Sequence, residues 1–231
     1  MLNKFYLLRN TGVLFTFLSS LSALVLTAED SKVSADSSWC EKFDKAQRSG
    51  LPLNWSKQGA KLGVPMTSCN IKDSVLQVHC NKSTGGIAIS PKVDLNKTPV
   101  MRWRWRVKKY PPEADGRNPQ KDDQAVAIYV GMNDGMLKKK SIAYRWETLT
   151  PKAYEGTTTY AKVLSVHYIV MQNSAIPAGT WITETRNIVE DFKRVYGKVP
   201  TEFAISVNGN SQYTKSDTLA EIDFIEFIPQ K

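Results

Sequence analysis

The clearest pattern in the chain is the alternation of apolar and basic side chains in Met-Arg-Trp-Arg-Trp-Arg-Val at residues 101–107. Successive side chains of a β-strand point to opposite faces, so the pattern predicts a strand with Trp103 and Trp105 on an apolar face and three arginines on a polar face. Two indoles on one face present more apolar surface than an isolated hairpin can cover. We therefore expect this segment to be a central strand of a large sheet.

Further short apolar runs, separated by turn residues, continue along the chain. Together they predict roughly nine strands, enough for two packed sheets in a mostly-β sandwich. In the last run Ile222 and Phe224 share one phase whereas Ile225 and Phe227 share the other, so a β-bulge near Phe224 would let both pairs face apolar surroundings. The runs occupy residues 75–78, 87–89, 100–107, 125–130, 142–146, 163–171, 181–184, 203–207 and 222–228.

Residues 187–197 have the periodicity of a helix instead, with apolar side chains recurring on one helical face. Asn187 can accept a hydrogen bond from a free amide of the first turn, Glu190 stands three residues further on as in a capping box, and Gly197 suits a left-handed stop. A second, shorter helix is expected at residues 39–48, before Ser49-Gly50.

The amino-terminal segment has a basic, apolar and then small-residue order. Lys4 and Arg9 precede an apolar run, and no acidic residue occurs before Glu29. This order predicts a secretory signal peptide, cleaved after Ala28 or Ala35. An uncleaved membrane anchor is the disfavoured alternative, because serines interrupt the run and it is short for a membrane span. We expect an exported protein, periplasmic or secreted, with no stable transmembrane anchor after cleavage.

Composition indicates one globular domain, since the 231-residue chain is 42% hydrophobic and 23% charged. We divide it into the signal peptide at 1–28, a polar tail with the short helix at 29–50, and a β-sandwich domain at 51–231. Cleavage removes two basic residues, so the formal charge of +9 falls to +7. This positive excess is spread along the chain, which argues against a nucleic-acid partner and favours anionic molecules of the cell envelope.

Three cysteines are present, Cys40, Cys69 and Cys80. Export permits disulfides, and the short separation of Cys69 and Cys80 suits a hairpin, so this pair is the favoured disulfide and Cys40 is left over. The cysteines lack the spacing of a zinc site, and the two histidines, His79 and His167, lie in strand-like runs where a structural role is the usual explanation.

A long irregular segment, residues 110–124, follows the arginine–tryptophan strand, and loops of this length are often functional. Asp122 and Asp123 stand where it enters the next apolar run. Adjacent carboxylates repel each other and need a partner that compensates their charge. We favour salt bridges to Arg102, Arg104 or Arg106, in which case the three arginines have a structural role. A calcium site helped by Glu113 or Asp115 is the weaker alternative, because the spacing matches no calcium-loop signature.

Two other clusters carry possible binding chemistry. Glu184 and Arg186 share a strand face next to the predicted helix, where an ion pair anchoring the helix to the sheet is favoured over a polar binding patch. Tyr144 and Trp146 alternate with smaller or charged residues, and their rings suit either sugar stacking or a sandwich core. The chain has no nucleophile motif, although a carboxylate pair drawn from Asp122 or Asp123 with Glu184 would suit glycoside hydrolysis at the required separation.

Four segments occur in an order that resembles a known family: Arg-Trp-Arg-Trp-Arg-Val at 102–107, Asp-Asp-Gln-Ala at 122–125, Ala-Tyr-Arg-Trp at 143–146, and Trp181 followed by Glu184, Arg186-Asn187 and Asp191-Phe192. The family that the chain resembles is an exported bacterial one, domain of unknown function 3047, and the similarity covers about residues 51–228. The resemblance implies a sandwich of galactose-binding or jelly-roll type with a signal peptide and no established activity. Family members usually carry an acidic Asp-Thr-Asp-like segment before the last strand, but this chain has Ser-Val-Asn-Gly-Asn-Ser at 206–211, which weakens any carboxylate-centred site. The residues that fit the family pattern are Asp122, Asp123, Glu184, Arg186 and Asp191.

We therefore expect a non-catalytic, exported binding module for a saccharide or another envelope-derived ligand, held near the 110–124 loop and needing no cofactor. The alternatives from other classes are the glycan-active hydrolase described above and a structural or assembly partner in the envelope. The expected ligand-binding residues are Asp122, Asp123, Tyr144, Trp146, Glu184, Arg186, Asn187 and Asp191.

Overall fold

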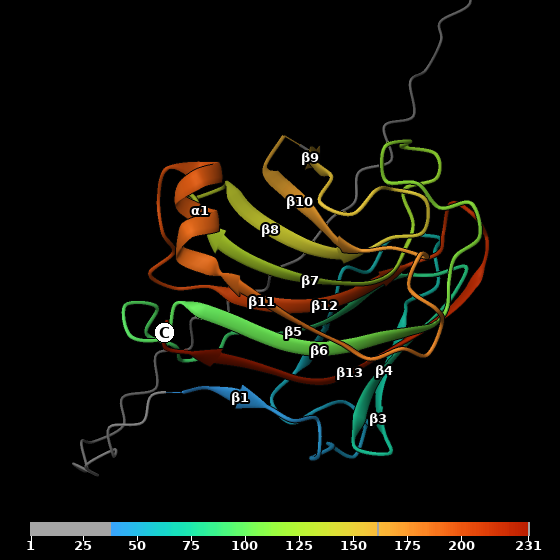
Figure 1. The fold of residues 1–231 in the computed structure, drawn as a ribbon, viewed down its shortest axis with the longest axis horizontal. Helices are drawn as coiled ribbons and strands as arrows, with labels where there is room; N and C mark the ends of the chain where they lie inside the picture. The colour runs from blue at the N-terminus through green and yellow to red at the C-terminus, as the bar shows by residue number, and fades with distance from the viewer. Residues whose placement is uncertain (1–37, 161, 231) are drawn as a thin grey trace, which may run out of the picture.

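The computed structural model describes residues 38–160 and 162–230, which form a two-sheet β-sandwich with one short helix in that part of the chain (Figure 1). The predicted signal peptide lies outside these residues. All strand pairs are antiparallel except β8 with β10. The small sheet has the order β11 (Ile182–Asn187), β6 (Val100–Lys109), β13 (Asp217–Ile228), β4 (Val75–Asn81) and β3 (Ser68–Lys72), with β1 (Cys40–Glu41) on β13. The large sheet has the order β2 (Ser56–Gln58), β5 (Thr84–Ile89), β12 (Ala204–Asn210), β7 (Gln124–Asn133), β8 (Lys139–Trp146), β10 (Leu164–Gln172) and β9 (Glu155–Tyr160).

Aromatic side chains from facing strands fill the space between the sheets. Trp103 and Trp105 of β6 are fully buried, which confirms the predicted phase of this central strand. The ring of Trp103 lies 5.3 Å from that of Tyr144, and the ring of Trp105 lies 5.4 Å from that of Trp146, measured between centroids. Tyr144 and Trp146 therefore belong to the core, which is the ordinary place for aromatic residues of a sandwich.

This packing also determines which side chains of the large sheet point away from the small one. In β8 the aromatic residues face inward, so Ala143 and Arg145 face outward, because side chains alternate along a strand. The register of the neighbouring strands places Tyr129 of β7 opposite Ala143, and Tyr168 of β10 beside it. We call this side of the large sheet the outer face.

The helix α1 (Ile188–Tyr196) closes the sandwich beside β11. Its start follows the prediction: the Asn187 side chain accepts a hydrogen bond from the Glu190 amide and donates one to the Glu190 carboxylate, and Gly197 ends the helix with φ at 69°. Among the described residues, no helix is long and apolar enough to span a membrane.

A buried polar network ties the helix to both sheets. Asp191 of α1 accepts a hydrogen bond of 2.8 Å from the Tyr144 hydroxyl of the large sheet. Arg186 of the small sheet donates to the same carboxylate over 2.9 Å. An ion pair between strand and helix is therefore present, but the acidic partner of Arg186 is Asp191 and not Glu184, which was expected to share the pair.

Two local predictions are wrong. Residues 39–48 form no helix; instead β1 pairs with β13, and Phe43 is fully buried against Trp55. The Glu41 carboxylate accepts from the Phe43 amide and the Trp55 indole, so tertiary contacts override the weak helical pattern. The second error concerns the cysteines. Cys69 and Cys80 lie on the expected hairpin, but both thiols are free and Cys69 is opposite Val78 rather than Cys80.

The arginines of β6 do not pair with Asp122 or Asp123. Arg102 pairs with Glu226, Arg104 with Asp223 and Arg106 with Glu221, all on the adjacent strand β13. The guanidinium groups of Arg104 and Arg106 also lie over the Trp181 ring, at 4.9 and 4.3 Å from its centroid. Cross-strand pairs of opposite charge stabilise a sheet face, so the arginine face is structural, as expected, with different partners. The register of β13 shifts between Ile222 and Phe224, which places the predicted bulge at Asp223.

Replacing Asn187 by Ala is expected to lower the free energy of unfolding by about 1 kcal/mol, because the Glu190 amide loses its capping acceptor. Urea denaturation monitored by far-UV circular dichroism measures this change. Asn187→Ser serves as the control, because its hydroxyl can accept from the Glu190 amide and can donate to the Glu190 carboxylate. An unchanged denaturation midpoint in Asn187→Ala would show that the cap does not contribute to stability.

Candidate functional site

The outer face of the large sheet is hollowed at the end where the 110–123 loop enters β7. The cavity has a volume of about 50 Å³, and its wall combines tyrosine rings with amide side chains. Strands β5, β7, β8, β9, β10 and β12 contribute to it, together with the end of the 110–123 loop and the turn after β12. We call it the loop-end hollow. The residues that line it are Thr84, Gly85, Asp122, Gln124, Tyr129, Ala143, Arg145, Thr158, Tyr160, Val166, Tyr168, Asn208, Gly209, Asn210, Gln212 and Tyr213.

Arg145 is the centre of this hollow's hydrogen-bond network. Its guanidinium donates to Asp122 over 2.5 Å and to the Gln124 side chain over 2.6 Å, and it lies 4.6 Å from the centroid of the Tyr168 ring. On its other side its Nε is 2.8 Å from a carboxylate oxygen of Glu147. One buried guanidinium is thus shared by two carboxylates. Burial opposes its charge, but these carboxylates outweigh that cost and raise the pKa of Arg145 well above its usual value.

Glu147 contacts Arg145 but does not itself line the hollow, and it has no exposed surface. Its carboxylate accepts hydrogen bonds from the Thr150 hydroxyl and the Gly116 amide, so it also holds the 110–123 loop. Burial raises the pKa of Glu147, and the nearby Arg145 only partly offsets that effect. This residue therefore supports the wall of the hollow without contacting solvent.

The two adjacent acidic residues of the predicted site have different roles. Asp122 lines the hollow, whereas Asp123 is fully buried. The Asp123 carboxylate accepts hydrogen bonds from the backbone amides of Tyr213 and Thr214 and from the Thr214 hydroxyl. Asp123 thus fixes the turn that carries Tyr213, whose side chain is 38% exposed at the rim.

The tyrosines of the hollow remain protonated at neutral pH. Burial raises the pKa of Tyr129 and of Tyr168 to about 12 each. The Tyr168 hydroxyl donates to the Gly116 carbonyl, and the Tyr129 hydroxyl accepts from Gln124. The hollow therefore offers apolar rings with fixed polar groups at their edges, which is the composition of small-ligand sites.

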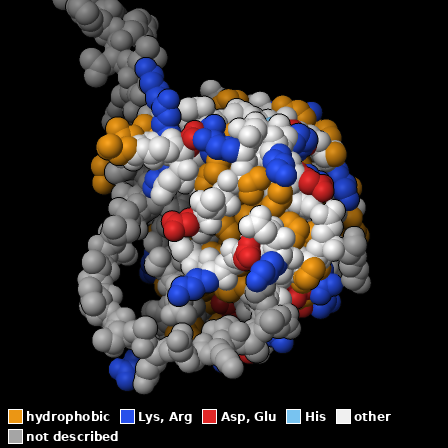
Figure 2. Space-filling view, turned by 90° about the vertical axis from the view of Figure 1, so that its left-hand side faces the viewer, with side chains coloured by type: hydrophobic (Ala, Val, Ile, Leu, Met, Phe, Trp, Pro, Cys, Tyr) orange, Lys and Arg blue, Asp and Glu red, His pale blue; other side chains and the backbone are white. Residues whose placement is uncertain are grey.

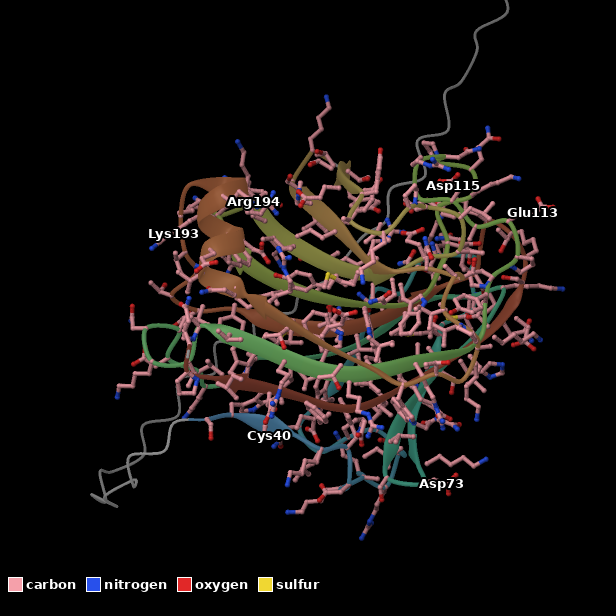
Figure 3. The ribbon with its side chains drawn as sticks, in the orientation of Figure 1. Cys40, Asp73, Glu113, Asp115, Lys193 and Arg194 are labelled. Atoms are coloured by element: carbon pink, nitrogen blue, oxygen red, sulfur yellow. The ribbon has the colours of Figure 1, made fainter. Side chains whose placement is uncertain are left out.

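Two carboxylates of the 110–123 loop, Asp115 and Glu113, are each paired with a cation. Asp115 pairs with Arg117, and Glu113 pairs with Lys121; the Arg117 guanidinium lowers the pKa of Asp115 to about 2. Both acids project from the loop at one end of the molecule, opposite α1 (Figure 3). Across residues 38–160 and 162–230, no three or more His, Cys, Asp or Glu side chains gather as a metal-ligand set.

The other predicted site residues do not reach the outer face. Tyr144 and Trp146 lie in the core, and Arg186 with Asp191 forms the network between the sheets. Asn187 caps the helix. Glu184 faces the sandwich interior and accepts a hydrogen bond from Gln172, and burial raises its pKa. Of the eight residues expected to bind ligand, Asp122 alone lines the loop-end hollow, while Asp123 acts on it indirectly.

Sequence reasoning missed most of the residues that line the hollow, notably Tyr129, Arg145, Tyr168 and Tyr213. The alternation in Ala143-Tyr144-Arg145-Trp146 contained the signal for Arg145, because an arginine opposite two core aromatics must face outward. Tyr213 lies in the turn after β12 and belongs to no periodic segment, so no pattern in the sequence indicated it.

The fold defines the class of this protein as a mostly-β sandwich of two sheets with one short helix in the described part of the chain. The model of the family described as "Protein of unknown function (DUF3047)" matches residues 54–226. The chain therefore belongs to this family, as the sequence resemblance indicated.

Solved structures with the same fold class are distant from this chain. The carbohydrate recognition domain of Emp47p is 15% identical, with coverage of 89% of this chain and all of that one, at a TM-score of 0.46. Winged bean acidic lectin, solved with methyl-α-D-galactose, is 12% identical over 84% of this chain and all of the lectin, at 0.45. Bacillus licheniformis β-glucanase is 10% identical over 85% of this chain and all of the enzyme, at 0.43. At these values the similarity does not indicate what this chain binds. No curated protein matches the chain.

Glu147→Gln is expected to remove a pH dependence of stability. The folded chain holds the Glu147 proton to a higher pH than the unfolded chain does, so this group's stabilisation is complete below pH 4.5 and is lost as the pH rises through the raised folded value. The free energy of unfolding of the wild type, relative to Glu147→Gln, should therefore fall as the pH rises above 4.5. Urea titrations at several pH values measure this difference.

The exposed Glu113 provides the control, because its pKa is lowered by Lys121 and Glu113→Gln should show no such fall. A difference between wild type and Glu147→Gln that stays constant, or rises with pH, would show that Glu147 is ionised throughout the range.

Proposed function

We propose that the protein is exported and binds a saccharide on the outer face of the large sheet. The observation that carries this proposal is the set of tyrosine rings and amide side chains around the loop-end hollow. The flat rings suit the apolar faces of sugars, while amides and hydroxyls suit their hydroxyl groups. Export rests on the sequence of residues 1–28, which has the order of a signal peptide.

The size of the hollow indicates how a saccharide would bind. A volume of about 50 Å³ is smaller than the few hundred Å³ of an enclosing ligand pocket. A sugar therefore lies across the hollow and inserts only a substituent. Tyr213 at the rim is placed to stack on that sugar, and Lys61, whose ammonium is 5.7 Å from the Tyr213 ring centroid and donates to Gln212, lies beside it.

The side chains of the hollow are held in place before any ligand arrives. Arg145 fixes Asp122 and Gln124, Asn210 donates to the Asp122 carbonyl, and Asp123 fixes the turn of Tyr213. Binding to a pre-organised surface loses less conformational entropy than binding to a mobile one. This rigidity supports a recognition site.

The position of the carboxylates does not support the hydrolase alternative. Asp123 is buried and saturated with hydrogen bonds, and Glu184 belongs to the small sheet. The outer face has a second hollow at its other end. Asp122, before β7, is the carboxylate that lines the loop-end hollow, and Glu202, before β12, is the carboxylate that lines the second one. Ala204 pairs with Gly131, so these two ends are separated by about seven residues of β7, roughly 20 Å, whereas glycosidase carboxylates lie about 5 to 10 Å apart.

A saccharide at one hundred times its dissociation constant should stabilise the purified protein by about 2.7 kcal/mol, which a thermal-shift screen over a saccharide library detects.

Tyr213→Ala is expected to weaken that binding about tenfold, which is about 1.4 kcal/mol, through loss of the stacking surface. Isothermal titration calorimetry measures the affinity.

Trp181→Ala is the matched control, because it removes an aromatic ring from the small sheet. Equal affinities of Tyr213→Ala and wild type would place the ligand elsewhere, and the absence of any thermal shift across the library would contradict saccharide binding.

A further inference from the structure

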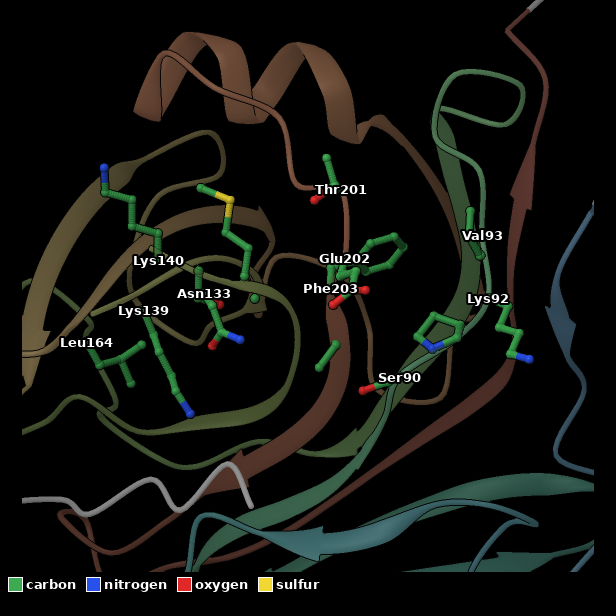
Figure 4. Close-up of a pocket in the computed structure, with 15 residues that line it drawn as sticks. Ser90, Lys92, Val93, Asn133, Lys139, Lys140, Leu164, Thr201, Glu202 and Phe203 are labelled. Carbon is green, nitrogen blue, oxygen red and sulfur yellow. The ribbon is translucent and has the colours of Figure 1, made fainter. Parts of the chain in front are cut away.

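A second and larger hollow lies at the opposite end of the large sheet. It has a volume of about 430 Å³, within the range of small-ligand sites. Five segments meet there: the chain after β5, the end of β7, the start of β8, the start of β10 and the chain that leads into β12. Figure 4 shows Ser90, Asn133, Lys139 and Glu202 from these segments arranged around it. We call it the hairpin-end hollow, since β7 and β8 join beside it.

The two hollows are neighbouring parts of one surface. Tyr129, Ala143 and Val166 line the loop-end hollow. Two residues further along the same strands, Gly131, Ser141 and Leu164 line the hairpin-end hollow. Residues two apart on a strand point to the same face, and their Cα atoms are roughly 7 Å apart. A linear ligand that follows these strands therefore passes from one hollow directly into the next.

The length of this surface exceeds that of one sugar. From Gln124 to Asn133, β7 spans roughly 30 Å at about 3.3 Å per residue. A monosaccharide fills one hollow at most, so a ligand that contacts both is a chain of several sugar units.

The two ends of this surface differ in charge. In the loop-end hollow, Asp122 and Arg145 neutralise each other. Three lysines, Lys92, Lys139 and Lys140, line the hairpin-end hollow against the single carboxylate of Glu202. Concave surfaces with charges of one sign focus the electric field and attract counter-ions.

The lysines of the hairpin-end hollow differ in their present contacts. Lys140 forms a salt bridge with Asp134, whereas Lys92 has no hydrogen bond or ion pair with any residue of the described ranges. Lys139 is half-buried, and burial lowers its pKa, so an anionic group of a ligand beside it would favour its charged form. Figure 2 shows that the lysine and arginine side chains on this side of the molecule are interspersed with acidic ones, so the excess of lysines is a local property of the hollow.

We infer that the outer face binds an acidic oligosaccharide, with neutral sugar units over the loop-end hollow and a carboxylate- or phosphate-bearing unit in the hairpin-end hollow beside Lys92 and Lys139. This inference rests on the proposed saccharide binding and adds to it the charge, the length and the direction of the ligand.

The test uses an array of oligosaccharides in matched pairs, each neutral chain beside the same chain bearing carboxylate or phosphate groups. The acidic member is expected to bind the purified protein at least about fivefold more tightly at low ionic strength, and raised salt should reduce this preference. Lys92→Gln with Lys139→Gln should abolish the preference, so that the two members of a pair bind with equal affinity. Carboxylate and phosphate arms distinguish the two acidic groups.

Two further variants make the outcomes decisive. Lys92→Gln alone should lower the preference about twofold without disturbing the fold, because Lys92 has no partner in the described chain. Lys72→Gln removes the same charge from the edge strand β3 of the small sheet and should change nothing. Neutral and acidic members that bind equally, or a preference that survives in the double variant, would overturn the inference while saccharide binding stands. Binding of no array member would overturn both.

Discussion

The interlocked rings of Trp103, Trp105, Tyr144 and Trp146 are the contact on which the rest of the structure depends. Their packing determines which side chains of β6 and β8 point into the core. Backbone pairing then determines the same for the adjacent strands β13 and β7. The indole N–H groups of Trp103 and Trp105 have no hydrogen-bond partner among the described residues. An unmade buried hydrogen bond costs about 1 to 3 kcal/mol, so ring packing determines this region despite that cost.

The sequence was sufficient for the fold class because its strongest signals were local. The alternation at 101–107 and the capping residues Asn187 and Gly197 each act within a few positions, and the structure confirms them. The segment at 39–48 failed because its structure depends on residues far along the chain: Glu41 bonds the Trp55 indole and its strand pairs with β13. A helical pattern without strong caps yields to such contacts.

The candidate site was harder to predict for the same reason. Charge pairs were expected between Asp122 and the β6 arginines, but the partner is Arg145 of β8, which no spacing in the sequence brings near. Tyr144 and Trp146 were ambiguous between core and ligand, and the assignment depended on the phase of a sheet built from other strands. Residues that lie on one face of a sheet come from many segments, so a single-sequence pattern identifies the strands and not the surface they form together.

Asp122 lines the loop-end hollow whereas Asp123 is buried behind it, and this difference affects how mutations would map the surface. Asp123 never faces a ligand, yet its carboxylate holds the turn on which Tyr213 stands. In an alanine scan read only by binding, Asp123 would rank with the contact residues, because losing it releases the turn. Ligand-protection footprinting would separate residues that contact the ligand from buried residues that only position them. A bound molecule shields the residues it touches, and Asp123 would not be among them.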